Sequence, residues 1–431
     1  MSLAHKIWIG IFLVAVMVTT IWVPLNHTPL AKIGNTIQWD AEGYYAYLPA
    51  TFVYGLEEMP RRTFIENGKP YLPDYPGTHK IFIKYTCGMA LLVAPFWLIA
   101  HGIALLFPAT FPPDGMNGIY MVALLFADAF YLVLGFWFCY LAYRRKLSLA
   151  AFLAASLSLW LGTSMLFYSS FHPGYAHTYS FCAFAVVLWL TPQLFSENKW
   201  WQWLLLGWVY GLIVLIRPIN GVIGLYVLLY DFKNITALGE RITKWLRSPK
   251  VWTAAAFSLL PFVPQFLYWY MLSGHLVLYS YGTETFSNWK DPMLFSVLFS
   301  TTNGLFVYAP IVLVAVLAGL FLREKEMQKA GIWAAIVPAW YFCAAWWCWW
   351  FGTCYGYRPL IEFYALLILP LGMLYQRAWR WPKLLSIPFF AGAALLVFIS
   401  VRMMYFFWGY WEGPDWTWES VRMVYRMALF L

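Results

Sequence analysis

Long apolar runs recur along the whole chain, and they decide what it can fold into. They lie at 7–24, 118–142, 148–167, 176–194, 201–216, 219–232, 252–272, 305–322, 332–350, 360–375 and 384–403. An α-helix of about 20 apolar residues crosses the hydrocarbon core of a bilayer. Charged residues form only 11% of the 431 residues, against roughly 25% in soluble domains. The sequence therefore predicts an all-α integral membrane protein of one domain, 1–431, with about 11 transmembrane helices.

The segment 86–107, "TCGMALLVAPFWLIAHGIALLF", is a further apolar run whose placement decides the topology. Lys and Arg concentrate in cytoplasmic loops. If the N-terminus is cytoplasmic and 86–107 does not cross, the loops that lie inside are the basic segments 144–146, 233–250, 323–329 and 377–383. If 86–107 crosses, the same segments fall outside. We therefore expect 86–107 to be an interfacial or re-entrant helix that Pro95 interrupts.

This topology leaves a first extracytoplasmic loop at 24–117 and an extracytoplasmic tail at 404–431, in which 418–430 can form an amphipathic interfacial helix. No small-residue cleavage site follows the run 7–24, so we interpret it as an uncleaved anchor helix. The six cysteines show neither metal-ligand nor disulfide spacing. The net charge is +9, but the basic residues flank the spans instead of forming one patch, which argues against nucleic acid as a partner.

Charged residues near the outer ends of the spans are the candidate functional residues. The stretch "QWDAEGYYAYLPA" (38–50) places Asp40 and Glu42 shortly after the first span. Basic residues on the same side are His79, Lys80, Lys84, Arg217 and Arg358. Charges close to the hydrocarbon are costly unless they are paired or hydrated. Such a set suits transfer from an anionic lipid-linked donor, in which cations hold the phosphate and a carboxylate deprotonates an acceptor hydroxyl.

Several stretches resemble motifs of the GT-C superfamily of membrane glycosyltransferases, the relatives of polyprenyl-phosphate-sugar-dependent mannosyl- and aminoarabinosyltransferases. The first is the acidic element "WDAEGYYAYLPA". The second, "IKYTCGMALLVAPF" (83–96), is similar to the family pattern K-Y-P-x-G-x-A-L-L-x-A-P-F, and the third, "YGYRPLIEFYALLILPLG" (355–372), to its aromatic-Gly-x-Arg element. In addition, "GWVYGLIVLIRPING" (207–221) resembles its Gly-x-x-x-Gly and Arg/Lys-Pro turn. Together they cover about a seventh of the chain.

The resemblance implies an inverting glycosyltransferase in the bacterial inner membrane, with an extracytoplasmic active site. It places Asp40 at the family's catalytic carboxylate, and Lys84, Arg217 and Arg358 where donor-phosphate or structural cations stand. The chain departs from the pattern at 86–87, where relatives have proline, which puts the local loop shape in doubt. The implied donor is a polyprenyl-phosphate-linked sugar. The acceptor would be a glycan, a lipid or a protein, and membrane lipids surround the enzyme.

Each candidate also has an alternative interpretation. Asp40 could cap a helix, and Glu42 could be a partner base, a ligand of a divalent cation, or an acid that favours the helix dipole. Lys84 and Arg358 could extend from span ends toward the interface. No other cofactor is indicated. Asp128, within a span, fits either a hydrogen bond between helices or the polar pathway of a carrier, so a transporter or flippase of a lipid-linked saccharide is the alternative function.

Overall fold

The structure is a computed structural model that describes residues 3–27, 37, 39–59, 65–66, 69–70, 72–322, 328–352, 354–407 and 411–430. Within these residues the chain is helical, apart from loops and an antiparallel pair of two-residue strands, β1 (Ile65–Glu66) and β2 (Lys69–Pro70). Gln38 and residues 323–327 of the basic segment 323–329, both used in the sequence analysis above, lie outside the described residues.

Seven helices are long and apolar enough to cross a membrane, and a bent pair makes an eighth candidate. The prediction of an all-α membrane protein is thereby confirmed in its fold class. The seven comprise α1 (Leu3–His27), α5 (Gly88–Leu106), α6 (Gly118–Tyr143), α9 (His177–Ser196), α13 (Pro249–Ser258) with η4 (Leu260–Phe262) and α14 (Val263–Ser273), η6 (Arg358–Phe363) with α19 (Tyr364–Ala378), and α20 (Lys383–Phe406). In the bent pair, α7 (Leu149–Leu161) turns by 70° into α8 (Ser164–Leu166) and η2 (Phe167–Phe171).

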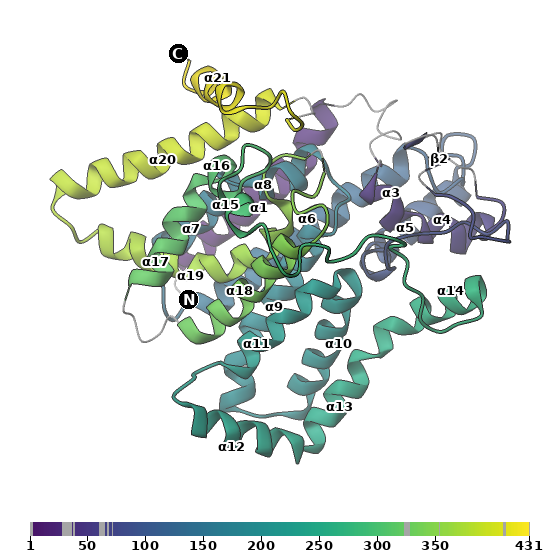
Figure 1. The fold of residues 1–431 in the computed structure, drawn as a ribbon, viewed down its shortest axis with the longest axis horizontal. Helices are drawn as coiled ribbons and strands as arrows, with labels where there is room; N and C mark the ends of the chain where they lie inside the picture. The colour runs from purple at the N-terminus through teal and green to yellow at the C-terminus, as the bar shows by residue number, and fades with distance from the viewer. Residues whose placement is uncertain are drawn as a thin grey trace.

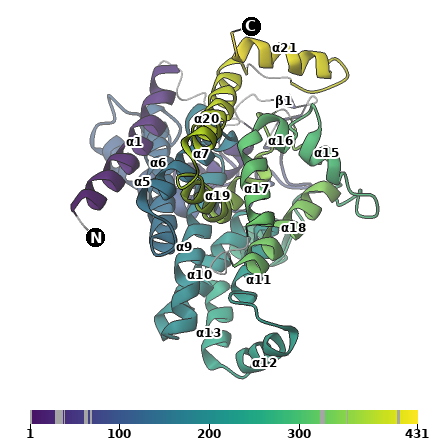
Figure 2. The ribbon, with the colours of Figure 1, turned by 90° about the vertical axis from the view of Figure 1, so that its left-hand side faces the viewer.

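Three shorter apolar helices coincide with predicted spans: α10 (Trp200–Ile216), η3 (Pro218–Val222) with α11 (Ile223–Leu228), and α17 (Pro310–Phe321). The remaining helices are α3 (Asp40–Tyr45), α4 (Tyr47–Pro49), η1 (Ala50–Tyr54), α12 (Ile235–Leu246), α15 (Leu294–Phe299), α16 (Leu305–Tyr308), α18 (Lys329–Ala345) and α21 (Trp418–Ala428). The helix predicted at 418–430 is thus present as α21. Figures 1 and 2 place α21 and α12 at opposite ends of the molecule.

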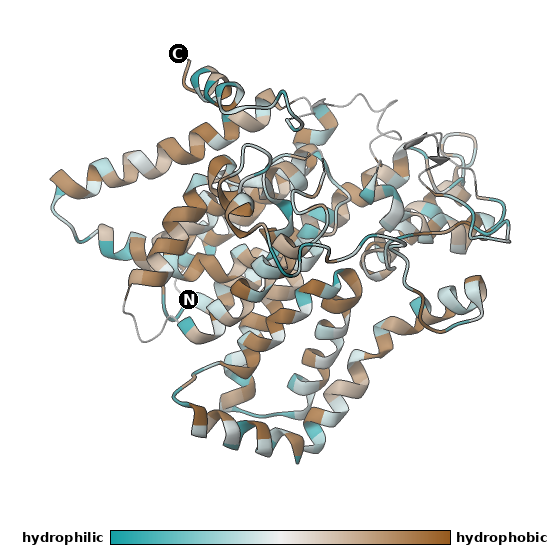
Figure 3. Ribbon diagram, viewed as in Figure 1, coloured by the Kyte–Doolittle hydropathy of each residue, from teal (hydrophilic) through white to brown (hydrophobic). Residues whose placement is uncertain are grey.

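The bundle has an inner and an outer set of helices. In their most apolar stretches, 89% of the residues of Arg358–Ala378 and 72% of those of α9 are buried, against 17% in α20. The inner helix α19 packs against α7, α17 and α9. Figure 3 shows hydrophobic residues along the outer helix α20, whereas hydrophilic residues gather in the loops. Apolar side chains exposed on the outer helices are the surface that a bilayer covers.

Close packing of α10 on α13 depends on two glycines in the stretch "GWVYG". A Cβ at Gly207 would lie 2.1 Å from the carbonyl oxygen of Ala254, and one at Gly211 would lie 2.2 Å from that of Ser258. Small residues four apart let two helix backbones approach in this way. The contact places α10 beside the span that begins at α13, and Arg217 follows directly at the end of α10.

Gly207→Ala is expected to lower the thermal unfolding temperature in detergent, because the added methyl group forces α10 away from α13. Overpacking of this kind costs about 1–3 kcal/mol. The matched control is Gly239→Ala, where a Cβ meets nothing within 4 Å, so its unfolding temperature should stay unchanged or rise. Equal unfolding temperatures of the two variants would contradict the inferred packing.

The structure corrects three details of the predicted spans. The break predicted at Pro95 is wrong, because α5 continues through it from Gly88 to Leu106. Proline is more frequent in transmembrane helices than in soluble ones. The run 332–350 leaves the helix after Ala345, and the run 305–322 breaks between α16 and α17.

The helix α5 runs beside α6 in the opposite direction. The Tyr131 hydroxyl of α6 donates a hydrogen bond to the carbonyl of Leu92, in the first half of α5. The Tyr120 hydroxyl, at the start of α6, is hydrogen-bonded to Nδ1 of His101, in the second half of α5. The N-terminal end of α5 lies against the end of α10, since a Cβ at Gly88 would meet Ile216. Residues 84–87, just before α5, are thereby brought to the end of α10, where Arg217 follows.

Candidate functional site

Asp40 is the first residue of α3, and its side chain turns toward a late segment of the chain. One carboxylate oxygen, Oδ2, lies 2.9 Å from Nη2 of Arg358. The preceding residue, Trp39, has φ 57° and ψ −130°, a backbone conformation that is sparsely populated for a residue with a Cβ. No side-chain hydrogen bond caps α3. The Asp40 carboxylate therefore forms an ion pair with a distant segment, and it does not cap α3, which was the alternative interpretation of this residue.

Tyr85 holds the other oxygen of the same carboxylate. Its hydroxyl donates to Oδ1 of Asp40 over 2.6 Å. The ring lies against α3, where its centroid is 4.6 Å from that of Tyr44 and where Gly43 leaves it room: a Cβ at Gly43 would stand 2.4 Å from Cδ2 of Tyr85. The glycine in "DAEGYY" thus permits the close approach that orients the Tyr85 hydroxyl toward Asp40.

Arg358 opens η6 and has contacts on three sides. Besides Asp40, its guanidinium donates to the carbonyl of Phe351 over 3.1 Å and lies 5.4 Å from the centre of the Tyr175 ring. Burial, and then the charge of Arg358, lowers the pKa of His172 to about 4, so that this imidazole is neutral at neutral pH. Arg358 is therefore the principal positive charge in this part of the site.

The segment that carries His172 and Tyr175 is held by Asp128. This carboxylate, buried within α6, accepts hydrogen bonds from the backbone N–H of Gly174 over 2.7 Å and from the hydroxyl of Thr178 over 3.3 Å. Gly174 has φ +88°, a conformation that favours glycine. Asp128 thus links α6 by hydrogen bonds to Gly174 and to the start of α9, which agrees with the first of its two interpretations, a hydrogen bond between helices.

Lys84 forms an ion pair with Glu284, which comes from the loop between α14 and α15. Its ammonium nitrogen also lies 5.1 Å from the centre of the Tyr281 ring, and the backbone carbonyl of Lys84 accepts a hydrogen bond from the hydroxyl of Ser280. The pair is partly exposed, with 34% of the Lys84 side chain and 26% of the Glu284 side chain accessible. The loop 274–293 is therefore attached to the segment just before α5.

Arg217 lies at the turn between α10 and η3 and pairs with a fully buried acid. Its Nη1 is 2.8 Å from Oε1 of Glu362, whose other oxygen is 3.1 Å from Nδ1 of His177. The amide of Asn220 donates to the same Oε1 over 2.9 Å. A buried carboxylate needs partners of this kind, because an uncompensated charge in the interior is very costly. Arg217 itself remains 15% exposed.

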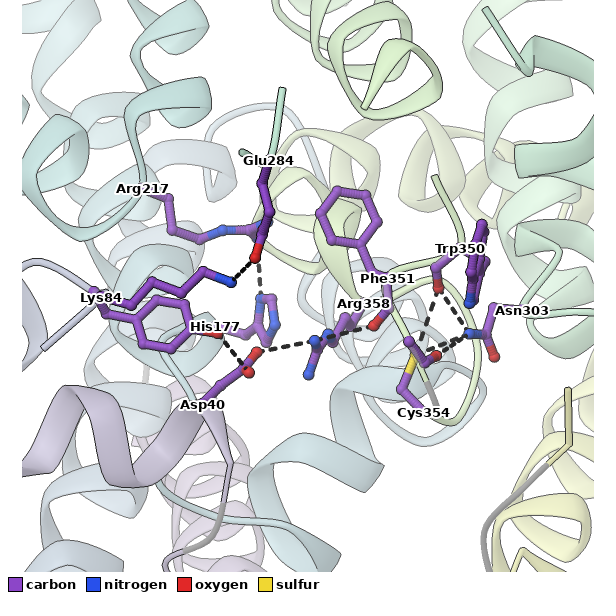
Figure 4. A network of polar contacts seen from close by, with 12 residues as sticks. Asp40, Lys84, His177, Arg217, Glu284, Asn303, Trp350, Phe351, Cys354 and Arg358 are labelled. Carbon is purple, nitrogen blue, oxygen red and sulfur yellow. Dashed lines mark hydrogen bonds and ion pairs between the residues drawn. The ribbon is translucent and has the colours of Figure 1, made fainter. Parts of the chain in front are cut away.

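These side chains surround Tyr44 and form one polar site. The pKa of the Tyr44 hydroxyl is raised well above its usual value by burial, then by Tyr281 and Asp40, whereas Arg217 and Arg358 lower it. Direct contacts link the same groups, because Tyr44 packs on Tyr85, whose hydroxyl binds Asp40 and whose ring centre lies 5.7 Å from the Lys84 ammonium nitrogen. Figure 4 shows Lys84 joined to Glu284 and Arg358 joined to Asp40, with Arg217 in the same region, all from segments that are far apart in the sequence.

Four of the predicted residues, Asp40, Lys84, Arg217 and Arg358, thus come together. The other three are placed differently. Glu42 is buried, with 5% of its surface exposed, and lies two residues from Asp40 on α3, so the two side chains leave the helix in different directions. Lys80 donates to the carbonyl of Met271 at 3.0 Å, and His79 is exposed.

Sequence reasoning missed Tyr85, Glu284 and Glu362, and His177 was not among its candidate residues. Glu284 lies in a polar loop with no motif around it, but Glu362 had a signal: it is an acid four residues after Arg358 at the start of an apolar run. Among the described residues no group of three or more His, Cys, Asp or Glu side chains could hold a metal ion. The divalent cation considered for Asp40 and Glu42 remains untested.

Comparisons of the chain with protein-family models, with curated proteins and with solved structures find no match.

Proposed function

We propose that the protein is an inverting glycosyltransferase of the GT-C type, which transfers a sugar from a polyprenyl-phosphate donor to an acceptor hydroxyl. The observation that supports it most is the site around Asp40. There a carboxylate with 22% of its side chain exposed meets Arg358. Lys84 lies beside Tyr85, which holds the same carboxylate, and Arg217 and Arg358 both lower the pKa of Tyr44. A base beside several cations is the arrangement that transfer from a phosphate-linked donor requires.

In this proposal Asp40 accepts the proton of the acceptor hydroxyl while the hydroxyl oxygen attacks the anomeric carbon. The bond between that carbon and the phosphate oxygen breaks, and the lipid phosphate leaves with the bonding electrons. A single displacement inverts the anomeric configuration. Tyr85, which donates to Oδ1, keeps the carboxylate in one orientation, and fixed geometry of this kind favours reaction.

The cations have two roles in the proposed reaction. Arg358, Lys84 and Arg217 would hold the charge that develops on the departing phosphate. Arg358 and Lys84 are each paired with a partly exposed carboxylate, Asp40 and Glu284, so a donor phosphate can compete for them. When the phosphate engages Arg358, the Asp40 carboxylate loses its ion pair and becomes available as the base.

The alternative of a flippase depended on Asp128 as a polar residue within a span. Its carboxylate oxygens accept hydrogen bonds from Gly174 and Thr178, which is the behaviour of a structural acid. The charged residues of the site come instead from the first loop, the 274–293 loop and the helix ends at Arg217 and Arg358. This arrangement favours catalysis over a carrier function.

We also propose that the helices form about 11 spans, with the N-terminus in the cytoplasm and α5 as a non-crossing helix. The eight long candidates include α5, and the three shorter apolar helices and α18 add the remaining spans. In this topology the Asp40 site faces the extracytoplasmic side of a bacterial inner membrane.

The proposal is tested by incubating the purified protein with a panel of polyprenyl-phosphate sugars and measuring the release of free lipid phosphate together with sugar transfer. A transferase releases lipid phosphate only when an acceptor, or water in its place, is consumed. A flippase would move the intact donor across reconstituted vesicles without releasing phosphate. Movement of intact donor with no phosphate release, across the panel, would overturn the proposed activity.

A further inference from the structure

The helix α12, between α11 and α13, is amphipathic. Its apolar residues are spaced as one face of a helix: Ile235, Leu238, Ile242, Trp245 and Leu246. Its polar and charged residues, among them Glu240, Thr243 and Lys244, fall on the opposite side. No residue of α12 is buried, although an amphipathic helix of a globular protein would bury its apolar face.

Within the described residues, the apolar face contacts the rest of the protein through the Trp245 ring. The Trp245 ring lies 5.6 Å from that of Trp203 in α10 and 6.1 Å from that of Phe195 in α9. Arg241 donates to the carbonyls of Leu228 and Tyr230, which ties α12 to the end of α11.

The rest of the face is open: Ile235 is 75% exposed and Leu246 is 59% exposed. The apolar face therefore points toward the side of α12 on which α9 and α10 run into the membrane. Exposed apolar residues in that position are suited to acyl chains and not to water.

The polar side of α12 carries cations without counter-ions. Lys244 and Arg247 are exposed, and within the described residues neither forms an ion pair. They line a surface concavity of about 660 Å³ together with Glu240, Thr243 and Ser248. The concavity combines two cations and two hydroxyl groups with one carboxylate, so its net charge is positive and its groups match the phosphate and polar groups of a lipid headgroup.

We propose that α12 lies in the headgroup layer of the membrane and that this concavity binds the headgroup of an anionic phospholipid. The apolar face contacts the acyl chains, and Lys244 and Arg247 contact the phosphate. Arg217 and η3 precede α11, whereas α12 follows the other end of α11. Figures 1 and 2 show α12 at one extremity of the molecule, below α10 and α11. The proposal is independent of the proposed transfer reaction, because no residue of the Asp40 site takes part.

The test compares the wild-type protein with the double variant Lys244→Gln/Arg247→Gln, purified in detergent. Native mass spectrometry measures the binding of added phosphatidylglycerol and of neutral phosphatidylcholine. Each basic residue near an anionic lipid surface contributes on the order of 1 kcal/mol, so the double variant should bind phosphatidylglycerol about 30-fold more weakly. Phosphatidylcholine binding should stay unchanged, and each single variant should show part of the loss.

The matched control is Arg380→Gln/Lys383→Gln, two exposed cations at the junction between α19 and α20 that line no part of this concavity. It removes the same charge and should leave most of the phosphatidylglycerol binding intact. Lys244 and Arg247 are exposed, so the α12 variant should keep the wild-type unfolding temperature. Unchanged phosphatidylglycerol binding in the α12 variant, or an equal loss in the control, would overturn the proposal.

Discussion

Asp40→Asn is expected to lower the rate of sugar transfer by about 10²–10⁴, the contribution of one positioned general base. The substitution keeps the shape of the side chain and removes the group that accepts the proton. Donor binding should persist, because Arg358, Lys84 and Arg217 remain. The measurement is the initial rate of lipid-phosphate release at saturating donor, alongside donor affinity by titration.

The matched control for this variant is Asp291→Asn, which removes the same charge from an exposed residue of the 274–293 loop. Its transfer rate should equal that of the parent protein. The unfolding temperature of Asp40→Asn should fall less than that of Glu362→Gln, since the Asp40 side chain is 22% exposed and the amide oxygen can still accept a hydrogen bond. Transfer by Asp40→Asn at the parental rate would exclude Asp40 as the base, whereas loss of donor binding would assign it to binding.

Glu362→Gln should have the largest effect on stability. Glu362 is fully buried and accepts hydrogen bonds from Arg217 and Asn220, while His177 lies on its other oxygen. Removing one partner of a buried ion pair leaves the other charge uncompensated, which costs about 3–5 kcal/mol. The unfolding temperature in detergent should therefore fall steeply, and the transfer rate should fall with it, because Arg217 loses its fixed position.

Two further variants separate this explanation from a general loss of packing. Glu284→Gln removes an acid of the same type from the partly exposed pair with Lys84, and it should change the unfolding temperature little. The double variant Arg217→Gln/Glu362→Gln removes both charges and should recover part of the lost stability, because coupled residues are not additive. If the double variant were less stable than Glu362→Gln by the full cost of a second independent substitution, the ion pair would not be the cause.

The positions of most helices could be predicted from the sequence, because they depend on local composition. Apolar runs near 20 residues predicted most of the helices, and an amphipathic pattern predicted α21. Predictions that depended on a single residue were weaker. Pro95 was expected to break α5, but the helix continues through it while packing against α6 and α10. A proline's local preference is overridden where neighbouring helices hold the segment in place.

For the candidate site, the sequence identified some of the residues, but it did not predict which residues they contact. The sequence by itself determined that the chain is a membrane protein, and it identified Asp40, Lys84, Arg217 and Arg358, because charges next to apolar runs stand out locally. Only the tertiary structure decided their partners. Glu284 lies 200 residues from Lys84, and Glu362 lies 145 residues from Arg217. No periodicity or spacing encodes contacts at such separations, since they arise when helices pack and a buried charge must find its counter-ion.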